Sequence, residues 1–199
     1  GQIFTSSGAG VGAVYEDAAG GGAWTFISKA TASSSATIAF TSGLDSTYES
    51  YMFNFVNIHP ETDTTRWQFQ GSIDGGSNYN VACTASYFLC STGESSGGEL
   101  SFKEDINSHQ NTGYVTLDVD HSNAADASLN GKLYLFDPSN TTFAKHWISR
   151  INAMKSTQTM ENYTAGYFNT TSAINAVSFK MNSDDTDSGT ISLYGLSSS

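Results

Sequence analysis

Polar and hydrophobic side chains alternate along most of this chain with a period of two residues, which is the period of a half-buried β-strand. Trp67 and Phe69, for example, flank Gln68 and would place two large rings on one face of a strand. Residues 51–58 are apolar on both faces over most of their length, which is typical of a central strand covered on both sides. The strands that these patterns predict are residues 24–30, 36–40, 51–58, 66–71, 81–90, 114–120, 132–137, 143–153, 160–168, 173–181 and 189–196.

Helical patterning is weak throughout the sequence. No window shows a sustained period of 3.6 residues, and residues 151–160 come nearest to a short helix, although we favour irregular structure there. Short polar segments such as 74–78 and 184–189 separate the strands at the spacing of an all-β sandwich or barrel. The sequence therefore predicts one all-β domain of about ten to twelve short strands.

Residues 1–23 differ from the rest of the chain, because they are rich in Gly and Ser and poor in apolar side chains. They include the run Gly20–Gly21–Gly22 and a glycine-rich stretch at 8–12. Segments of this kind are flexible or extended and do not build a core. We expect an N-terminal connector over residues 1–23 and a β-sandwich domain over residues 24–199. The absence of an initiator Met also suggests a piece of a longer chain, and no signal peptide is visible.

The charge balance restricts the possible partners. The formal net charge is −11, so the phosphate backbone of a nucleic acid would be repelled. No run of 18 apolar residues predicts a transmembrane helix, and we expect no membrane insertion. Only 14% of the residues are charged, so Ser, Thr, Asn and Gly must cover much of the surface. Such a surface suits an extracellular or virion β-protein.

The residues that carry chemistry do not combine into a recognisable catalytic, cofactor or metal site. The aspartates fall into two groups, Asp118, Asp120 and Asp126, and Asp184, Asp185 and Asp187. Neither group fixes the pair of carboxylates that a glycosidase needs. The second group lies in a turn, where Asp is common for backbone reasons, although a calcium ion is a possible ligand there.

Histidine and cysteine add no site to this picture. The histidines are far apart and lack metal-binding spacing, which favours scattered surface or loop positions: His59, His109, His121 and His146. Cys83 and Cys90 are interpreted as two small buried apolar residues, because a secreted disulfide framework would contain more cysteines. We therefore expect no catalytic residues, no cofactor and no metal.

Two sets of residues remain as candidates for structural or binding roles. Ser72, Asp74, Gly76 and Tyr79 resemble an Asp-box hairpin, in which the Asp side chain caps a turn and the aromatic packs beneath it. A sugar-stacking platform is the other candidate, although most large aromatics of a sandwich belong to the core. The aromatics considered are Trp24, Trp67, Tyr79, Tyr87, Trp147, Tyr163 and Tyr167, and the named glycan-contacting candidates are Trp67, Tyr79 and Trp147.

Several stretches resemble a family of tailed-bacteriophage virion structural domains, tail-fibre-like or head-decoration proteins of marine and freshwater phages. Residues 1–10, GQIFTSSGAG, are similar to the connector that precedes the last domain of phage fibres. The other similar segments are residues 22–28, 31–36, 40–48, 131–138 and 188–196. The resemblance implies an antiparallel β-sandwich, jelly-roll-like, that is displayed on a virion after assembly in the bacterial cytoplasm. It also implies a homotrimer and contacts with other virion proteins, but it supplies no catalytic residues.

The expected function is therefore structural and non-enzymatic. The leading hypothesis is the distal domain of a fibre that contacts the host surface or its glycans. The alternative is a capsid decoration, cement or head-fibre protein with a purely structural role. A depolymerase of host polysaccharide is the third hypothesis, and the lack of a fixed carboxylate pair disfavours it.

Overall fold

The computed structural model describes residues 2–5, 14–17, 24–95 and 97–196. None of these residues belongs to a helix, and so no helix that could span a membrane occurs among them. The described strands are β1 Gln2–Thr5, β2 Val14–Asp17, β3 Thr25–Ser35, β4 Ile38–Phe40, β5 Ser50–Pro60, β6 Trp67–Ser72, β7 Cys83–Gly93, β8 Glu99–Phe102, β9 Ser108–Asn111, β10 Val115–Thr116, β11 Leu129–Phe136, β12 Lys145–Lys155, β13 Gln158–Phe168, β14 Ala176–Met181 and β15 Thr186–Leu196.

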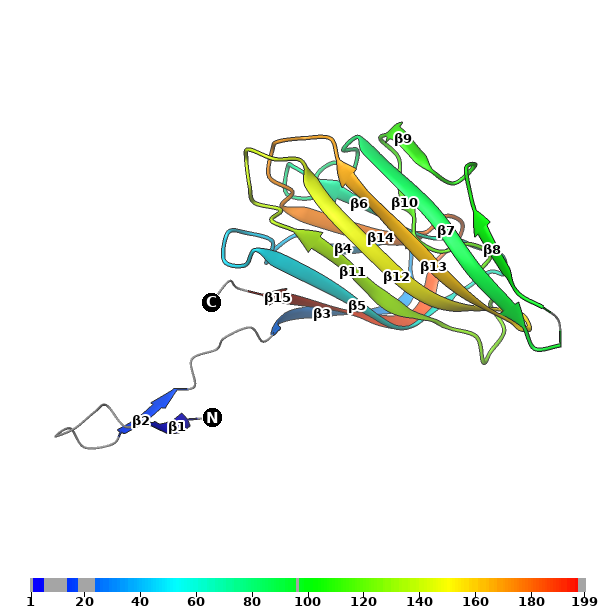
Figure 1. Ribbon diagram of the computed structural model, residues 1–199, viewed down its shortest axis with the longest axis horizontal. Helices are drawn as coiled ribbons and strands as arrows, with labels where there is room; N and C mark the ends of the chain where they lie inside the picture. Colours follow the sequence, from blue (N-terminus) through cyan, green and yellow to red (C-terminus); the bar gives the residue numbers. More distant parts are fainter. Residues whose placement is uncertain (1, 6–13, 18–23, 96, 197–199) are drawn as a thin grey trace.

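Two antiparallel sheets pack face to face from β3 onward (Figure 1). The large sheet has the order β3-β15-β5-β11-β12-β13-β7-β8, and β9 also pairs with β7. The small sheet has the order β10-β6-β14-β4. The predicted fold class, an antiparallel β-sandwich, is confirmed. Its sheets, of nine and four strands, are less equal than the two sheets of an eight-stranded jelly roll.

Aromatic side chains fill the space between the sheets. Phe179 of β14 stacks on Trp67 of β6, with ring centroids 5.8 Å apart and an angle of 9° between the planes. The same Phe179 meets the edge of Phe53 from β5 at 5.1 Å. All three side chains are completely buried, and each contributes about 1.5–3 kcal/mol to folding through removal of apolar surface from water. The alternating pattern of the sequence thus corresponds to one shared core.

Most predicted strands are confirmed, and the departures have simple physical causes. β5 lies between β15 and β11, in the interior position that its apolar faces predicted. Residues 151–160 form neither helix nor irregular structure: β12 turns into β13 at Ser156, whose φ is 52°. β8 and β9 were missed because they are short strands with few buried side chains at the edge of the sheet.

The connector contains local structure that its composition did not predict. β1 and β2 pair antiparallel, with Gln2 opposite Asp17 and Thr5 opposite Val14. The glycine-rich stretch 8–12 and the glycines at 20–22 lie outside the described residues. A two-stranded ladder is therefore the described feature of residues 1–23.

Candidate functional site

The outer face of the large sheet, which points away from the core, carries several large side chains. Backbone register places Lys132, Arg150, Tyr163 and Phe88 side by side on β11, β12, β13 and β7. The neighbouring row contains Tyr134, Ile148, Ala165 and Ser86 on the same four strands. Because side chains two residues apart on a strand share a face, both rows point to solvent. Phe88 and Ile148 are 43% and 46% exposed and line the same hollow, so they form part of one apolar patch at the surface.

These two rows form an apolar pocket. Phe88 and Tyr163 stack with ring centroids 4.9 Å apart and planes 7° from parallel. The small side chains Ala165 and Ser86 leave space beside them, and Tyr134 and Ile148 also line the cavity of about 400 Å³. That volume lies within the range of small-ligand pockets, about 300–1,000 Å³. The pocket can hold one ring-sized apolar group.

A line of hydrogen-bonded polar side chains begins at this pocket. The Arg150 guanidinium lies over the Tyr163 ring, 5.4 Å from its centroid, and pairs with the carboxylate of Glu161. Glu161 raises the pKa of Arg150, so the guanidinium stays charged. Asn152 donates from Nδ2 to Glu161 Oε2 at 3.1 Å and to Thr159 Oγ1 at 2.8 Å. The line therefore holds four side chains in fixed orientations on the surface.

The Asn130 side chain of β11 is oriented by hydrogen bonds to a bulge in β5 and to Ser128. β5 contains a bulge here, because Leu129 pairs with Ile58 whereas Gly131 pairs with Phe55. The Asn57 amide within the bulge donates to Asn130 Oδ1 at 2.9 Å. Asn130 Nδ2 also donates to Ser128 Oγ at 3.1 Å, so this amide is oriented before any ligand arrives.

Three hollows of the outer face join into one groove. The apolar pocket shares Tyr134 and Arg150 with a polar hollow, which in turn shares Asn130 and Asn152 with a third hollow near the β12–β13 turn. The groove runs along β11, β12 and β13 over about six residues, or about 20 Å. We call it the outer groove. Its aromatic end and amide-rich continuation suit an elongated ligand.

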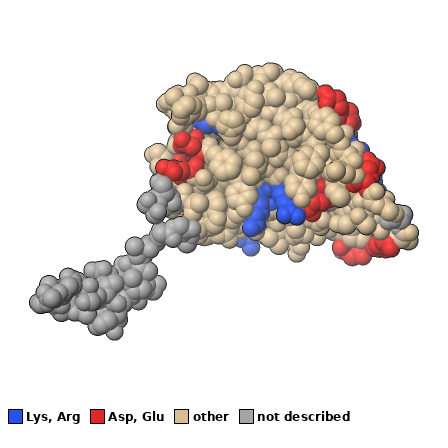
Figure 2. Space-filling model, in the orientation of Figure 1, with Lys and Arg blue, Asp and Glu red and all other residues tan. Residues whose placement is uncertain are grey.

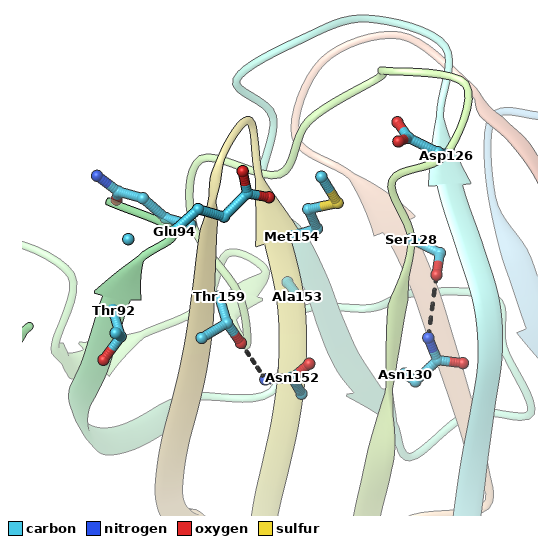
Figure 3. A pocket seen from close by; sticks show the side chains of 11 residues that line it. Thr92, Glu94, Asp126, Ser128, Asn130, Asn152, Ala153, Met154 and Thr159 are labelled. Carbon is cyan, nitrogen blue, oxygen red and sulfur yellow. Dashed lines mark hydrogen bonds between the residues drawn. The ribbon is translucent and has the colours of Figure 1, made fainter. Parts of the chain in front are cut away.

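The far end of the outer groove carries two acidic side chains. Figure 3 shows Glu94 and Asp126 on opposite sides of this hollow, with Met154 between them. Both carboxylates are exposed. Their carboxylate oxygens can accept hydrogen bonds from the hydroxyls of a ligand.

A second polar constellation has catalytic residue types but no access. Tyr87 donates its hydroxyl to Asn162, and Asn162 Nδ2 donates to Asp118 Oδ1 at 2.8 Å. Asp118 Oδ2 lies 3.1 Å from His121 Nδ1. All four side chains are at most 1% exposed. A general acid or base must reach its substrate, so this buried chain cannot act as a catalytic relay.

The electrostatics of the buried chain agree with a role in folding. Burial raises the pKa of the Asp118 carboxyl, while the hydrogen bond and charge of His121 act in the opposite direction. Burial also raises the pKa of Tyr87. His121 Nε2 is buried and has no hydrogen-bond partner among the described residues. Of the histidines expected at surface or loop positions, His121 lies in the loop between β10 and β11, but its side chain is completely enclosed and does not reach the surface.

The structure also corrects two of the named glycan-contacting aromatics. Trp67 is 0% exposed and Trp147 is 1% exposed, because both lie on the inner faces of the sheets. Neither ring can stack on an external sugar. Tyr79 is half-buried at the turn that follows β6, away from the outer groove. Of the wider set of aromatics, Tyr163 is the one that lines the apolar pocket.

The turn at residues 72–79 is explained by its own hydrogen bonds. Asp74 Oδ1 accepts from the Asn78 amide at 2.9 Å, and Ser72 Oγ donates to the same carboxylate at 2.7 Å. The Asn78 and Ser72 side chains hold the pKa of Asp74 at about 2. Gly76 has φ of +90°, and an added Cβ would lie 2.8 Å from the Tyr79 hydroxyl. These contacts account for the motif by turn geometry.

The remaining side chains that could ligate a metal do not come together in one site. Within the described ranges, no group of three or more His, Cys, Asp or Glu side chains is placed to hold a metal ion. Cys83 is buried and burial raises the pKa of its thiol to about 12, whereas Cys90 is exposed, so the prediction of two buried cysteines is wrong for Cys90. Asp184 and Asp187 are exposed, and Asp187 lies 3.6 Å from the ring of His59.

Sequence reasoning missed most of the groove residues, although one signal was present. In β7, Cys83, Tyr87 and Leu89 lie on the buried side of the alternation, which leaves Phe88 among the outward positions. Ile148 is likewise the residue that follows the buried Trp147. A large apolar residue at a solvent-facing position of an alternating strand is the pattern that marks this surface.

Comparison with protein-family models, with curated proteins and with solved structures gave no match.

Proposed function

We propose that the chain is a non-enzymatic structural module of a bacteriophage virion, and that it contacts the host surface by binding an oligosaccharide in the outer groove. The observation that supports the binding role is the stack of Phe88 and Tyr163 beside an apolar pocket, continued by fixed amides. Aromatic rings pack against the apolar face of a sugar ring, while oriented amide and carboxylate groups bond its hydroxyls. The virion setting rests on the resemblance of the connector and strand segments described above.

The outer face of the large sheet carries few charged side chains, which suits a sugar ligand (Figure 2). In Figure 2 the large sheet faces the viewer, and most of that face is neither acidic nor basic. An uncharged surface with a few fixed polar groups can bind a hydrated, hydroxyl-rich ligand without the cost of burying unpaired charges. The length of the groove favours several linked sugar units over a single small molecule.

Alanine substitution of one stacked ring tests the binding role. We expect Phe88→Ala to weaken binding of the purified chain to its best ligand on an array of bacterial surface oligosaccharides by about tenfold. The loss of one aromatic contact is worth up to about 1.5 kcal/mol, and tenfold corresponds to about 1.4 kcal/mol.

Phe143→Ala is the matched control, since Phe143 is 68% exposed and does not line the groove. It should bind as the unsubstituted chain does. Equal losses in both variants, or no sugar binding by the correctly folded chain, would contradict the proposal.

A capsid decoration or cement role remains the second candidate, and one observation favours it. Leu100 and Phe102 of β8 are 76% and 60% exposed at the edge of the large sheet. Exposed apolar side chains on an edge strand favour contact with another protein. Electron microscopy of intact particles with the chain labelled would distinguish a position on the capsid from a position at a fibre tip. A label spread over the capsid lattice would overturn the fibre proposal.

A further inference from the structure

We propose that the outer groove selects acidic oligosaccharides, and that Lys132 binds the anionic group of a sugar unit seated near the aromatic pocket. This inference rests on the proposed function, because it names the class of ligand for the same groove. The shared chemistry is a sugar ring that carries a carboxylate or a sulfate ester.

In the described part of the chain, the charges of neighbouring strands leave Lys132 without a counter-ion. Lys132 on β11 lies directly opposite Arg150 on β12. Like charges in this arrangement destabilise a sheet. Glu161 compensates Arg150, to which it is paired, and is itself oriented by Asn152. Lys132 has no ion pair or side-chain hydrogen bond among the described residues.

Basic residues are scarce in this chain. The sequence has 8 Lys and Arg against 19 Asp and Glu, so two cations on adjacent strands are a concentration of positive charge. Figure 2 shows Lys and Arg side chains gathered over the part of the large sheet that contains β11 and β12. Positive charge here does not serve solubility, because it reduces the magnitude of the net charge of −11.

The range of electrostatic forces determines which charges act on a bound ligand. The net negative charge of the molecule would repel an anion at long distance. At physiological salt the Debye length is about 8 Å, so acidic residues farther away are largely screened. A sugar unit seated near the aromatic pocket therefore responds mainly to the local charges of Lys132, Arg150 and Glu161, which sum to one positive charge, whereas a unit at the far end of the groove meets the carboxylates of Glu94 and Asp126.

The position of Lys132 relates the anion to the sugar ring. Tyr134 and Arg150 line both the apolar pocket and the polar hollow, and Lys132 lines the polar hollow. A ring in the apolar pocket therefore places its substituents toward Lys132. The Arg150 guanidinium is already engaged by Glu161 and Tyr163, which leaves the Lys132 ammonium as the available donor. An ammonium group acts as a point charge, so it can pair with either a carboxylate or a sulfate.

Calorimetric titration with three polymers tests the inference. The probes are oligogalacturonate, which carries carboxylates, sulfated dextran oligomers and uncharged dextran oligomers. We expect tighter binding of at least one acidic probe than of dextran, and we expect Lys132→Gln to weaken acidic binding by about fivefold, or about 1 kcal/mol. The acidic probe whose affinity falls in Lys132→Gln shows whether Lys132 recognises a carboxylate or a sulfate.

Lys29→Gln is the matched control. Lys29 is an exposed lysine of the same sheet, three strands from Lys132 in the register through Ser192 and Asn54. It removes the same charge without reaching the groove and should leave affinity unchanged. Equal effects of the two lysine variants would overturn the inference, since they would show only a general charge effect.

Two further outcomes separate this inference from the proposed function. If dextran binds as tightly as the acidic probes and only Phe88→Ala weakens it, acidic selection is wrong while sugar binding in the groove stands. If none of the three probes binds and no array sugar binds either, both proposals fail.

Discussion

The buried chain of Tyr87, Asn162, Asp118 and His121 and the exposed line of Arg150, Glu161, Asn152 and Thr159 contain similar kinds of side chain in opposite surroundings. The first lies inside the sandwich, where its four side chains bond to one another, although His121 Nε2 has no partner among the described residues. The second lies on the outer face, where most of its groups still meet solvent. Residue type alone would point to the buried chain as a catalytic site. Because a ligand can reach only exposed side chains, accessibility instead favours the outer groove as the candidate binding site.

Because of this difference in surroundings, we expect the buried chain to contribute to stability and the exposed line to contribute to ligand binding. A buried polar group that loses its partner keeps the full cost of its lost hydration, whereas an exposed group returns to water. Substitutions in the buried chain should therefore act on folding. Substitutions in the outer groove should act on ligand affinity and leave the fold nearly unchanged.

Removal of the buried carboxylate should have the largest effect on stability. Asp118→Ala leaves His121 Nδ1 without its partner and removes the 2.8 Å bond from Asn162 Nδ2, which keeps only longer bonds of 3.4 Å to the Ile151 and Met160 carbonyls. We expect the free energy of unfolding to fall by about 3–5 kcal/mol, measured by urea denaturation. Asn152→Ala is the exposed control and should cost less than about 1 kcal/mol. A loss below 1 kcal/mol for Asp118→Ala would show that the buried chain contributes little.

A smaller effect is expected in the pH dependence of stability. Because burial raises the pKa of Asp118, the folded protein binds this proton more tightly than the unfolded chain does. The stabilising contribution is therefore present below the ordinary carboxyl pKa of about 4 and is lost as pH rises through the native pKa. Asp118→Asn cannot ionise and should lose this dependence.

The measurement is urea unfolding of both proteins from pH 4 to pH 8. The stability of the unsubstituted chain relative to Asp118→Asn should fall as pH rises. A relative stability that increases with pH would mean that His121 holds Asp118 ionised against the effect of burial, and would reverse the assignment.

Much of the fold could be predicted because the alternation of the long strands reports burial directly. Lys145–Lys155 alternates buried and exposed residues over most of its length, as its sequence indicates. The segment 115–119 shows the limit of this reasoning. Its alternation predicts a solvent-facing Asp118, but Val115, Thr116, Leu117, Asp118 and Val119 are all buried because the segment is covered on both sides. Whether other parts of the fold cover both faces of a strand depends on tertiary structure, which the alternation of side chains along the strand cannot reveal.

The outer groove could not be predicted from the sequence for a related reason. Outward positions such as Phe88, Ile148 and Tyr163 follow from alternation within each strand, but their proximity depends on the strand order β7-β13-β12-β11. β7 is far from the other three in the chain, and its pairing with β13 brings Phe88 to Tyr163. Trp147 attracted attention by its size, although its neighbour Ile148 is the residue that reaches the surface.

The most direct test of the central claim is a nuclear magnetic resonance titration of the labelled chain with oligogalacturonate. If the outer groove is the binding surface, the largest chemical-shift changes should occur at Tyr163, Phe88, Tyr134 and Ile148, with smaller changes at Asn152 and Asn130. Signals of the buried Asp118, His121 and Asn162 should move little. Saturable changes that centre on another surface, with no change along β11, β12 and β13, would contradict the account.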